Sequence, residues 1–224
     1  MNDVHTAEKT DTAHLAWEQR WQTEEGRADW LRPDEGVSVQ IEKLQQRGPV
    51  KALDLGCGVG RHALAFSRAG FETHAMDLSQ AGLMELQGSA ASEGLNVTTH
   101  LAPMTELPFE DHVFDYVLSF NVIYHGDPAI VRKAISEIER VLKPGGIYQG
   151  TMLSKRNANF GIGSEIAPDT WVREGDGDKN HPHFYCNAAE LLDLFKGFEP
   201  FHLEDQEHRK PGSWHWHLTA ELLR

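Results

Sequence analysis

A glycine loop and two aspartates in the first third of the chain have the spacing of a nucleoside-binding site. Residues 56–60 read Gly-x-Gly-x-Gly directly after the apolar segment 50–55, and Asp54 lies just before them. Asp77 ends the next apolar segment, 21 residues after Gly56. Glycines let a backbone approach a ligand closely, and a carboxylate at the end of the second strand can accept both ribose hydroxyls. Together these residues predict a nucleoside bound across the first two strands of a sheet.

The loop differs from two common phosphate-binding loops. A dinucleotide loop has a glycine at its sixth position, where this chain has Arg61. A mononucleotide phosphate loop would end in Gly-Lys-Ser or Gly-Lys-Thr, and neither tripeptide occurs. The acidic Asp54 suits a ligand with a cationic amino group rather than a pyrophosphate. The sequence therefore disfavours a nicotinamide-dependent oxidoreductase.

Histidines form the second group of residues that could do chemistry. The chain has 13 of them. His181 and His183 flank a proline, while His215 and His217 alternate along an expected strand, where residues two apart share a face and could reach one metal. No carboxylate has a recognisable ligand spacing, so we expect no metal. The histidines are better candidates for proton acceptors, or for hydrogen-bond donors to an anionic substrate.

Alternating strands and helices must position these residues. We expect strands at 50–55, 71–76, 96–102, 113–119 and 147–153, with helices at 61–69, 79–93 and 127–142 between them. This order predicts an α/β fold, a doubly wound and mostly parallel sheet with helices on both faces, which binds ligands at the carboxyl ends of its strands. Further helices are expected at 11–22, 37–47 and 188–196, and strands at 199–205 and 213–218. Pro211-Gly212 predicts that the last two strands form a hairpin, so that the final strand is antiparallel.

The length of 224 residues suits a single domain with four parts. These are an N-terminal helical cap (1–48), a cofactor-binding core (50–153), an insert on the substrate side (154–186) and a C-terminal helix with a strand hairpin (187–224). The insert is rich in glycine and proline and shows no hydrophobic period. Long irregular segments in a compact domain are usually functional or mobile.

Charge and composition exclude several classes of partner. The net charge is −13 and there is no basic stripe, so we expect no nucleic-acid partner. No apolar run approaches the length of a membrane span, and the first 14 residues do not read as a signal peptide. With two cysteines the chain is no disulfide scaffold. We expect a cytoplasmic protein, monomeric or homodimeric, that acts on a small molecule.

Four ordered segments resemble the class I S-adenosylmethionine-dependent methyltransferases. They are ALDLGCGVGRHA (52–63), HAMDLS (74–79), LPFEDHVFDYVLSFNVIYH (107–125) and ISEIERVLKPGGIYQGT (135–151). The layout is similar to a small-molecule branch, methyltransferase type 11 or tellurite-resistance-like. The resemblance covers about residues 50–153 and implies a seven-stranded Rossmann-like sheet whose last strand is antiparallel. It also implies S-adenosyl-L-methionine as cofactor and S-adenosyl-L-homocysteine as product.

The resemblance assigns roles to cofactor contacts residue by residue. For the methionine part it implies that Gly56 and Gly58 line the moiety, that Asp54 holds its amino group, and that Asn121 and Val122 lie beneath the sulfonium. For the nucleoside it implies that Asp77 binds the ribose, that Leu78 packs on the adenine, and that Met104 and Thr105 lie along the adenine edge. Trp21 is a further expected contact. One departure is Pro103, which occupies a position where related sequences usually carry an acidic residue for the adenine amine.

The acceptor end of the site is expected to be built from four regions of the chain. Family members that methylate planar amines carry Asn/Asp-Pro-Pro-Tyr/Phe after the fourth strand, whereas this chain has SFNVIYH at 119–125, which disfavours that acceptor class. The candidate catalytic residues are His125, which is the first choice for a base, then His183, His215 and Tyr124. The candidate substrate-binding residues are Trp17, Arg156, His181 and Trp214.

The leading hypothesis is direct in-line methyl transfer to a small acidic or anionic molecule, because the sulfonium is already activated and the protein need only align a nucleophile and exclude water. Arg156 and the histidines favour an anionic acceptor. Two alternatives stay open: a methyltransferase for an oxo acid that uses histidine-ligated iron, and a non-catalytic protein that binds a metal or oxyanion with its histidine-rich C-terminal region.

Overall fold

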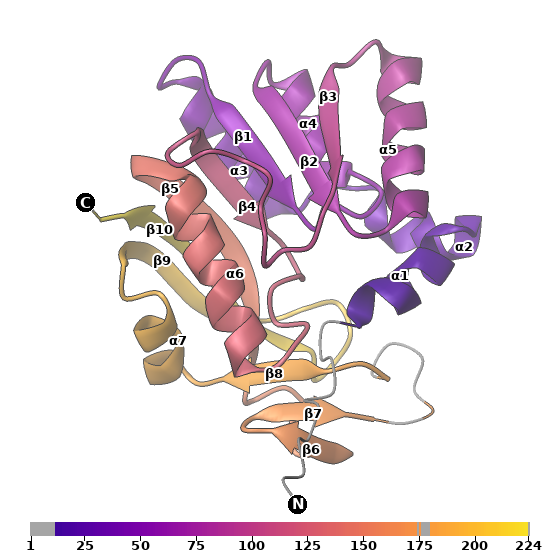
Figure 1. The fold of residues 1–224 in the computed structure, drawn as a ribbon, viewed down its shortest axis with the longest axis vertical. Helices are drawn as coiled ribbons and strands as arrows, with labels where there is room; N and C mark the ends of the chain where they lie inside the picture. Colours follow the sequence, from indigo (N-terminus) through magenta and orange to yellow (C-terminus); the bar gives the residue numbers. More distant parts are fainter. Residues whose placement is uncertain (1–11, 174, 176–179, 224) are drawn as a thin grey trace, which may run out of the picture.

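A computed structural model describes residues 12–173, 175 and 180–223. A single twisted sheet forms its centre (Figure 1). Seven strands follow one another across this sheet in the order β3 (Val97–Leu101), β2 (Glu72–Asp77), β1 (Lys51–Leu55), β4 (Phe114–Ser119), β5 (Leu142–Ser154), β10 (Trp214–Leu222) and β9 (Phe198–Glu207). The first five are parallel, and β10 is antiparallel to both of its neighbours. This arrangement confirms the predicted fold class and the C-terminal hairpin.

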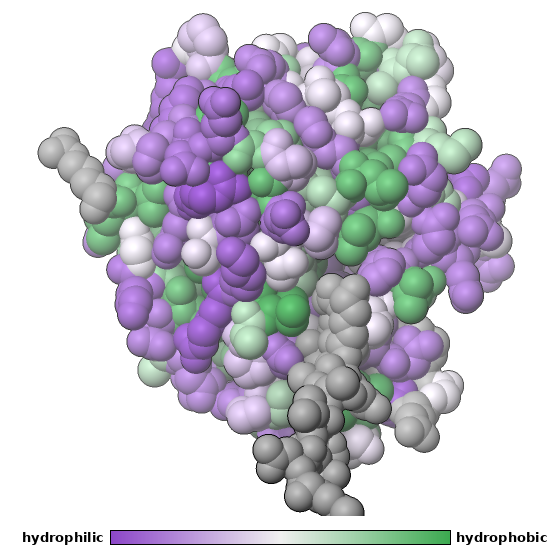
Figure 2. All heavy atoms as spheres, in the orientation of Figure 1, coloured by the Kyte–Doolittle hydropathy of each residue, from purple (hydrophilic) through white to green (hydrophobic). Residues whose placement is uncertain are grey.

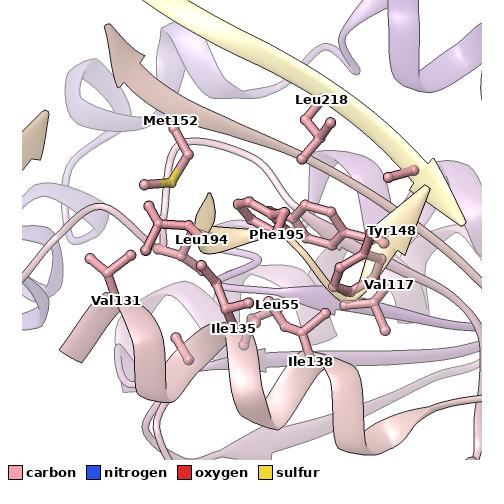
Figure 3. Packing of buried hydrophobic residues seen from close by; sticks show 14 of the residues in the cluster. Leu55, Val117, Val131, Ile135, Ile138, Tyr148, Met152, Leu194, Phe195 and Leu218 are labelled. Carbon is pink, nitrogen blue, oxygen red and sulfur yellow. The ribbon is translucent and has the colours of Figure 1, made fainter. Parts of the chain in front are cut away.

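Helices cover both faces of the sheet, and the strands supply a hydrophobic side chain to each face in turn. Alternate residues of β1 and β4 enter different clusters: Leu53, Leu55 and Val117 pack under α6 (Pro128–Val141) and α7 (Ala188–Leu194). Ala52, Tyr116 and Leu118 pack under α3 (Glu35–Gln45) and α4 (Arg61–Arg68), while α5 (Gln80–Glu93) packs beside β2 and β3. Figure 3 shows Ile135 and Ile138 of α6 pointing at Leu55 and Val117. Because alternate side chains are buried on each face, packing against both helix layers fixes the strands and therefore the position of their carboxyl ends.

The insert is more regular than its sequence predicts. It contains three short strands, β6 (Ser164–Ala167), β7 (Thr170–Val172) and β8 (His183–Cys186). β8 pairs in parallel with the end of β5, and β7 and β6 follow it antiparallel. The expectation of an irregular segment is therefore wrong for these three strands, while the described residues between them form turns and loops; residues 174 and 176–179 lie outside the described part. Strands of three or four residues are too short for alternation to show, and all four residues of β8 are buried.

The N-terminal segment lies across the carboxyl ends of the strands, next to α5 (Figure 1). It consists of α1 (Ala13–Trp21), α2 (Glu24–Arg27) and a 3₁₀ turn, η1 (Ala28–Trp30). Glu18 fixes α1 in place, because one of its oxygens accepts the Ser79 hydroxyl at 2.6 Å and the Ala81 N–H at 3.1 Å. The helix predicted at 11–22 is present, whereas residues 1–11 of the predicted cap lie outside the described residues.

Hydrophilic side chains dominate the face that carries α6, with hydrophobic residues scattered among them (Figure 2). Across the described ranges, none of the helices combines the length and the hydropathy that a membrane crossing requires.

Candidate functional site

A pocket opens where the carboxyl ends of β1, β2 and β4 meet the underside of α1. The space inside it that no atom fills is about 950 Å³, including the part open to solvent. Nine of the ten predicted cofactor contacts line this pocket: Trp21, Gly56, Gly58, Asp77, Leu78, Met104, Thr105, Asn121 and Val122. Their individual roles remain predictions.

The glycine loop forms the floor of the pocket. Gly56 and Gly58 have φ values of 68° and 54°, in the left-handed region that glycine adopts without strain. A Cβ on Gly56 would collide with Val122, and a Cβ on Gly58 would lie 2.9 Å from the Trp21 ring. The loop is also tied to β2, because the Gly56 and Cys57 N–H groups both donate to the Met76 carbonyl. Side chains at these positions would fill the cradle that a ligand needs.

Asp77 links the loop to the next helix. Its two carboxylate oxygens accept the N–H groups of Gly58 and Ser79, each at 2.8 Å. Burial raises the pKa of Asp77, while the backbone hydrogen bonds from Ser79 and Gly58 act in the opposite direction. Each oxygen keeps a second lone pair with which it can accept a ligand hydroxyl.

Asn121 has a strained backbone at the end of β4. Its φ of 62° is uncommon for a residue other than glycine, and such strain concentrates at functional sites. The Thr151 hydroxyl holds this conformation: it accepts the Asn121 N–H at 2.8 Å and donates to the Asn121 side-chain oxygen at 3.0 Å. The sharp turn directs Asn121 and Val122 into the pocket.

Three tryptophans close the pocket from above. Trp17 and Trp21 stack with their centroids 5.0 Å apart, and Trp30 meets both rings edge-on at 5.2 and 5.7 Å. Trp21 is buried against Gly58 and Gly82. All three line the pocket. The sequence pointed to Trp17 and Trp21; it gave no signal for Trp30, which comes from an unpredicted 3₁₀ turn.

Arg61 and His62 are pocket residues that sequence reasoning missed. The Arg61 guanidinium lies 5.1 Å from the Trp30 ring centre and 5.3 Å from that of Phe120, and it donates to the Arg32 carbonyl. His62 is buried, and its Nε2 accepts the Asp34 N–H. In the sequence, Arg61 stood out only as the residue that replaces a third glycine. The structure shows it as a cation in the wall of the pocket.

Aromatic and imidazole rings gather where the pocket ends at His125. Tyr124 lies 4.5 Å from His125, 6.1 Å from His183 and 5.9 Å from His215, measured between ring centres. His125 is also 5.0 Å from His181 and 4.9 Å from His183. All of these side chains are buried. β8 holds His181 and His183 beside Tyr124 and His125, because the Phe184 N–H donates to the Tyr124 carbonyl at 2.9 Å.

Four further residues singled out by the sequence, Arg156, Trp214, His215 and His217, are not in the wall of the pocket. The Arg156 Nε pairs with Asp205 at 2.7 Å and its guanidinium stacks on Trp214, so neither Arg156 nor Trp214 is in the wall of the pocket. His215 and His217 do share a strand face, but the ring of His208 lies against both. It stacks on His215 at 3.9 Å, and its Nε2 lies 2.8 Å from that of His217. Burial and the neighbouring His217 lower the pKa of His208 to about 4, which keeps its ring neutral.

Comparison with known proteins identifies a methyltransferase domain within the chain. Residues 52–146 match a family model described as a methyltransferase domain. The fold is similar to that of Burkholderia thailandensis 1,6-didemethyltoxoflavin-N1-methyltransferase, solved with S-adenosylhomocysteine, with a TM-score of 0.67, 22% identity and coverage of 95% of this chain and 89% of the other. The matched domain and the shared fold agree with the resemblance to the class I S-adenosylmethionine-dependent methyltransferases.

Curated relatives carry methyltransferase names. The chain is 29% identical over 182 residues to sterol 24-C-methyltransferase ERG6A of Gibberella zeae, covering 77% of this chain and 46% of the relative. It is 27% identical over 180 residues to the ubiquinone biosynthesis O-methyltransferase of Cereibacter sphaeroides, covering 78% of this chain and 70% of the relative. The chain therefore spans under half the length of the first of these relatives.

The pocket fits S-adenosylmethionine, the cofactor that the resemblance implies. Among the described residues, the buried Nε1 groups of Trp21 and Trp30 have no hydrogen-bond acceptor, and both tryptophans line the pocket. The pocket wall also carries a carboxylate at Asp77 and a guanidinium at Arg61. Ribose hydroxyls could donate to Asp77 and accept from the tryptophan N–H groups. An amino-acid carboxylate could pair with the Arg61 guanidinium.

Asp54 is the one predicted cofactor contact outside the pocket wall. It is 2% exposed, and its Oδ2 accepts the Ala63 N–H at 3.0 Å beneath the glycine loop. Burial is the main reason that the pKa of Asp54 rises to about 7. Its predicted contact with the methionine amino group therefore needs an approach through the loop, and it stays a prediction.

Asp54→Asn is expected to change how the free energy of unfolding depends on pH. A raised folded-state pKa means that the folded protein binds the proton more tightly, so the wild type loses stability as pH rises from about 4 through about 7. The loss is at most about 4 kcal/mol, at about 1.4 kcal/mol per pKa unit. Asparagine still accepts the Ala63 N–H but does not titrate.

Urea unfolding at pH 5 and pH 8 measures this effect. The stability of Asp54→Asn relative to wild type should increase between the two pH values, whereas the exposed control Asp29→Asn should show no such increase. An equal difference between Asp54→Asn and wild type at both pH values would contradict the expectation.

Proposed function

We propose that this protein transfers the methyl group of S-adenosylmethionine to a small acidic or anionic molecule. The observation that carries the proposal is the position of His125, which lines the cofactor pocket on one side and faces His181 and His183 on the other. The acceptor would bind at the end of the pocket, beside His125. Imidazole N–H groups can donate to an acidic group, or an imidazole can take a proton from it. Arg156 does not support an anionic acceptor, since Asp205 already neutralises it.

The residues of the chain have three tasks in such a reaction. When bound, S-adenosylmethionine supplies a methyl group already activated by the sulfonium charge. Asp77 and the glycine loop would hold the nucleoside, and the tryptophans of α1 and η1 would exclude water from the reacting atoms. His125 and Tyr124 would align the acceptor for in-line attack. When the nucleophile is already anionic it needs no base, so this alignment would supply most of the rate acceleration.

The acceptor class can be tested before the acceptor is identified. A cell extract is first fractionated by mass and by anion exchange, because methylation of an anionic atom removes its charge and the product no longer reveals it. Each fraction is then incubated with the enzyme and methyl-labelled S-adenosylmethionine. Label transfer is expected only with fractions that hold molecules below about 1 kDa retained by the anion exchanger. The variant Asp77→Ala should transfer none, and transfer to protein, to nucleic acid or with the unretained small molecules would contradict the proposal.

Arg61 is the proposed partner of the methionine carboxylate. Arg61→Gln is expected to weaken binding of S-adenosylhomocysteine by roughly 10- to 100-fold, because a hydrogen bond to a charged group contributes about 1.5–3 kcal/mol. Affinity for 5′-methylthioadenosine should stay unchanged, since that ligand has the adenine and ribose but no amino-acid carboxylate. Calorimetric titration of both ligands separates the two effects. Equal weakening for both would show that Arg61 only supports the pocket.

A further inference from the structure

We propose that His125, His181 and His183 form a binding site for one divalent transition-metal ion beside the cofactor pocket. One ring nitrogen from each of the three lies within 4.8 Å of those of the others, and all three residues are buried. A general base requires only one imidazole, so three neighbouring imidazoles exceed that need. Three imidazoles that converge on one point provide the ligand number of an open zinc or iron site.

The hydrogen bond of His183 sets its tautomer for ligation. His183 Nδ1 lies 2.7 Å from the His181 backbone carbonyl, and a carbonyl only accepts, so Nδ1 carries the proton. The Nε2 atom then presents a lone pair. Histidine ligands of metals commonly donate their other ring N–H to a carbonyl in this way, which fixes the ring and strengthens the ligand.

The backbone brings the three ligands together without distortion of the sheet. Pro182 separates His181 from His183, whose ring centres lie 4.4 Å apart, and β8 holds this segment against the loop after β4. Metal–nitrogen bonds of about 2.0–2.1 Å in a tetrahedral site place ligand atoms roughly 3.4 Å apart. Side-chain rotations that draw the nitrogens together by up to about 1.5 Å complete the site.

The donor set indicates the kind of ion. Three neutral imidazoles suit Zn²⁺, Fe²⁺, Co²⁺ or Ni²⁺ and disfavour Mg²⁺ and Ca²⁺, which take oxygen ligands. Three protein ligands leave at least one coordination position for an exogenous oxygen, nitrogen or sulfur atom. An anionic methyl acceptor would be such a ligand, but metal binding itself does not depend on the proposed acceptor class.

Cobalt titration of untagged, chelator-stripped protein tests the site in the absence of S-adenosylmethionine and acceptor. Wild type is expected to bind one Co²⁺ with the visible absorption of a four- or five-coordinate site, and Zn²⁺ should displace it. His183→Gln and His125→Gln should each weaken Co²⁺ binding by about 100-fold or more. Circular dichroism and thermal unfolding identify any variant that fails to fold, in which case His181→Gln provides the same comparison.

His100→Gln is the matched control. His74 and His100 form another histidine pair, with ring nitrogens 3.0 Å apart, at the sheet edge away from the pocket. The control should bind Co²⁺ like wild type. Absence of binding at about 100 μM Co²⁺, binding that persists in folded His183→Gln and His125→Gln, or binding lost in His100→Gln would each overturn the proposal. A protein that binds the metal but transfers no methyl group would refute the proposed function and leave the metal site standing.

Discussion

Asp77→Ala is expected to weaken binding of S-adenosylmethionine and S-adenosylhomocysteine by at least about 100-fold. The two oxygens of Asp77 hold the Gly58 and Ser79 N–H groups at 2.8 Å, so the carboxylate shapes the glycine loop as well as facing the pocket. Two hydrogen bonds from ribose hydroxyls to a charged group contribute roughly 3 kcal/mol or more, which corresponds to about two orders of magnitude in affinity. Calorimetric titration measures the loss.

Asp77→Asn tests whether a neutral side chain of the same size can replace the carboxylate. An amide has one acceptor oxygen, so its NH₂ group must face either the Gly58 or the Ser79 N–H, and the loop must shift. We therefore expect a loss close to that of the alanine variant. Asp115 is the matched control, because its two oxygens also accept two donors, the Lys51 N–H and the Lys143 ammonium, in the amino-terminal half of β4. Asp115→Asn should retain full affinity, and unchanged affinity in Asp77→Asn would exclude the ribose role.

The cofactor half of the site was predictable because its signals are local in sequence. Each of the first two strands is a short apolar run that ends at a glycine or an aspartate, and the topology of a parallel sheet brings those ends together. Asp54 shows where this reasoning stops. Its residue type and spacing indicated a ligand contact, but the spacing does not reveal that its carboxylate accepts the Ala63 N–H at the start of α4.

The acceptor half depends on pairings between distant segments. His125 follows β4, whereas His181 and His183 precede or begin β8. The pairing of β8 with β5 and the hydrogen bond from the Phe184 N–H to the Tyr124 carbonyl bring these segments side by side. Strand periodicity correctly put His215 and His217 on one face. It could not show that His208, beyond the end of β9, lies against both. Conversely, Arg61 had no motif of its own, and its place in the pocket follows from the packing of Trp30 and Phe120 around it.

Trp21→Ala is expected to raise the dissociation rate of S-adenosylhomocysteine at least about 10-fold and to lower the stability of the protein. Trp21 is 5% exposed and packs on Gly58 and Gly82, and its ring also stacks on Trp17. Truncation of a buried tryptophan costs about 3–5 kcal/mol. Because the same ring lies over the glycine loop, its removal also opens the pocket to water. Stopped-flow fluorescence and thermal unfolding measure the two effects separately.

Trp216→Ala and Trp21→Phe show which property of Trp21 matters. Trp216 packs against the core and its Nε1 donates to the Cys186 carbonyl at 2.9 Å, away from the cofactor pocket, so its truncation should cost stability without changing cofactor dissociation.

Trp21→Phe keeps an aromatic ring over Gly58 but removes the Nε1–H donor. If Trp21 only covers the loop, the phenylalanine variant should behave like wild type. If its indole N–H also binds the cofactor, affinity falls by roughly 5- to 10-fold, since a typical hydrogen bond contributes about 1 kcal/mol. A dissociation rate for Trp21→Ala no faster than that of Trp216→Ala would show that α1 does not close this pocket.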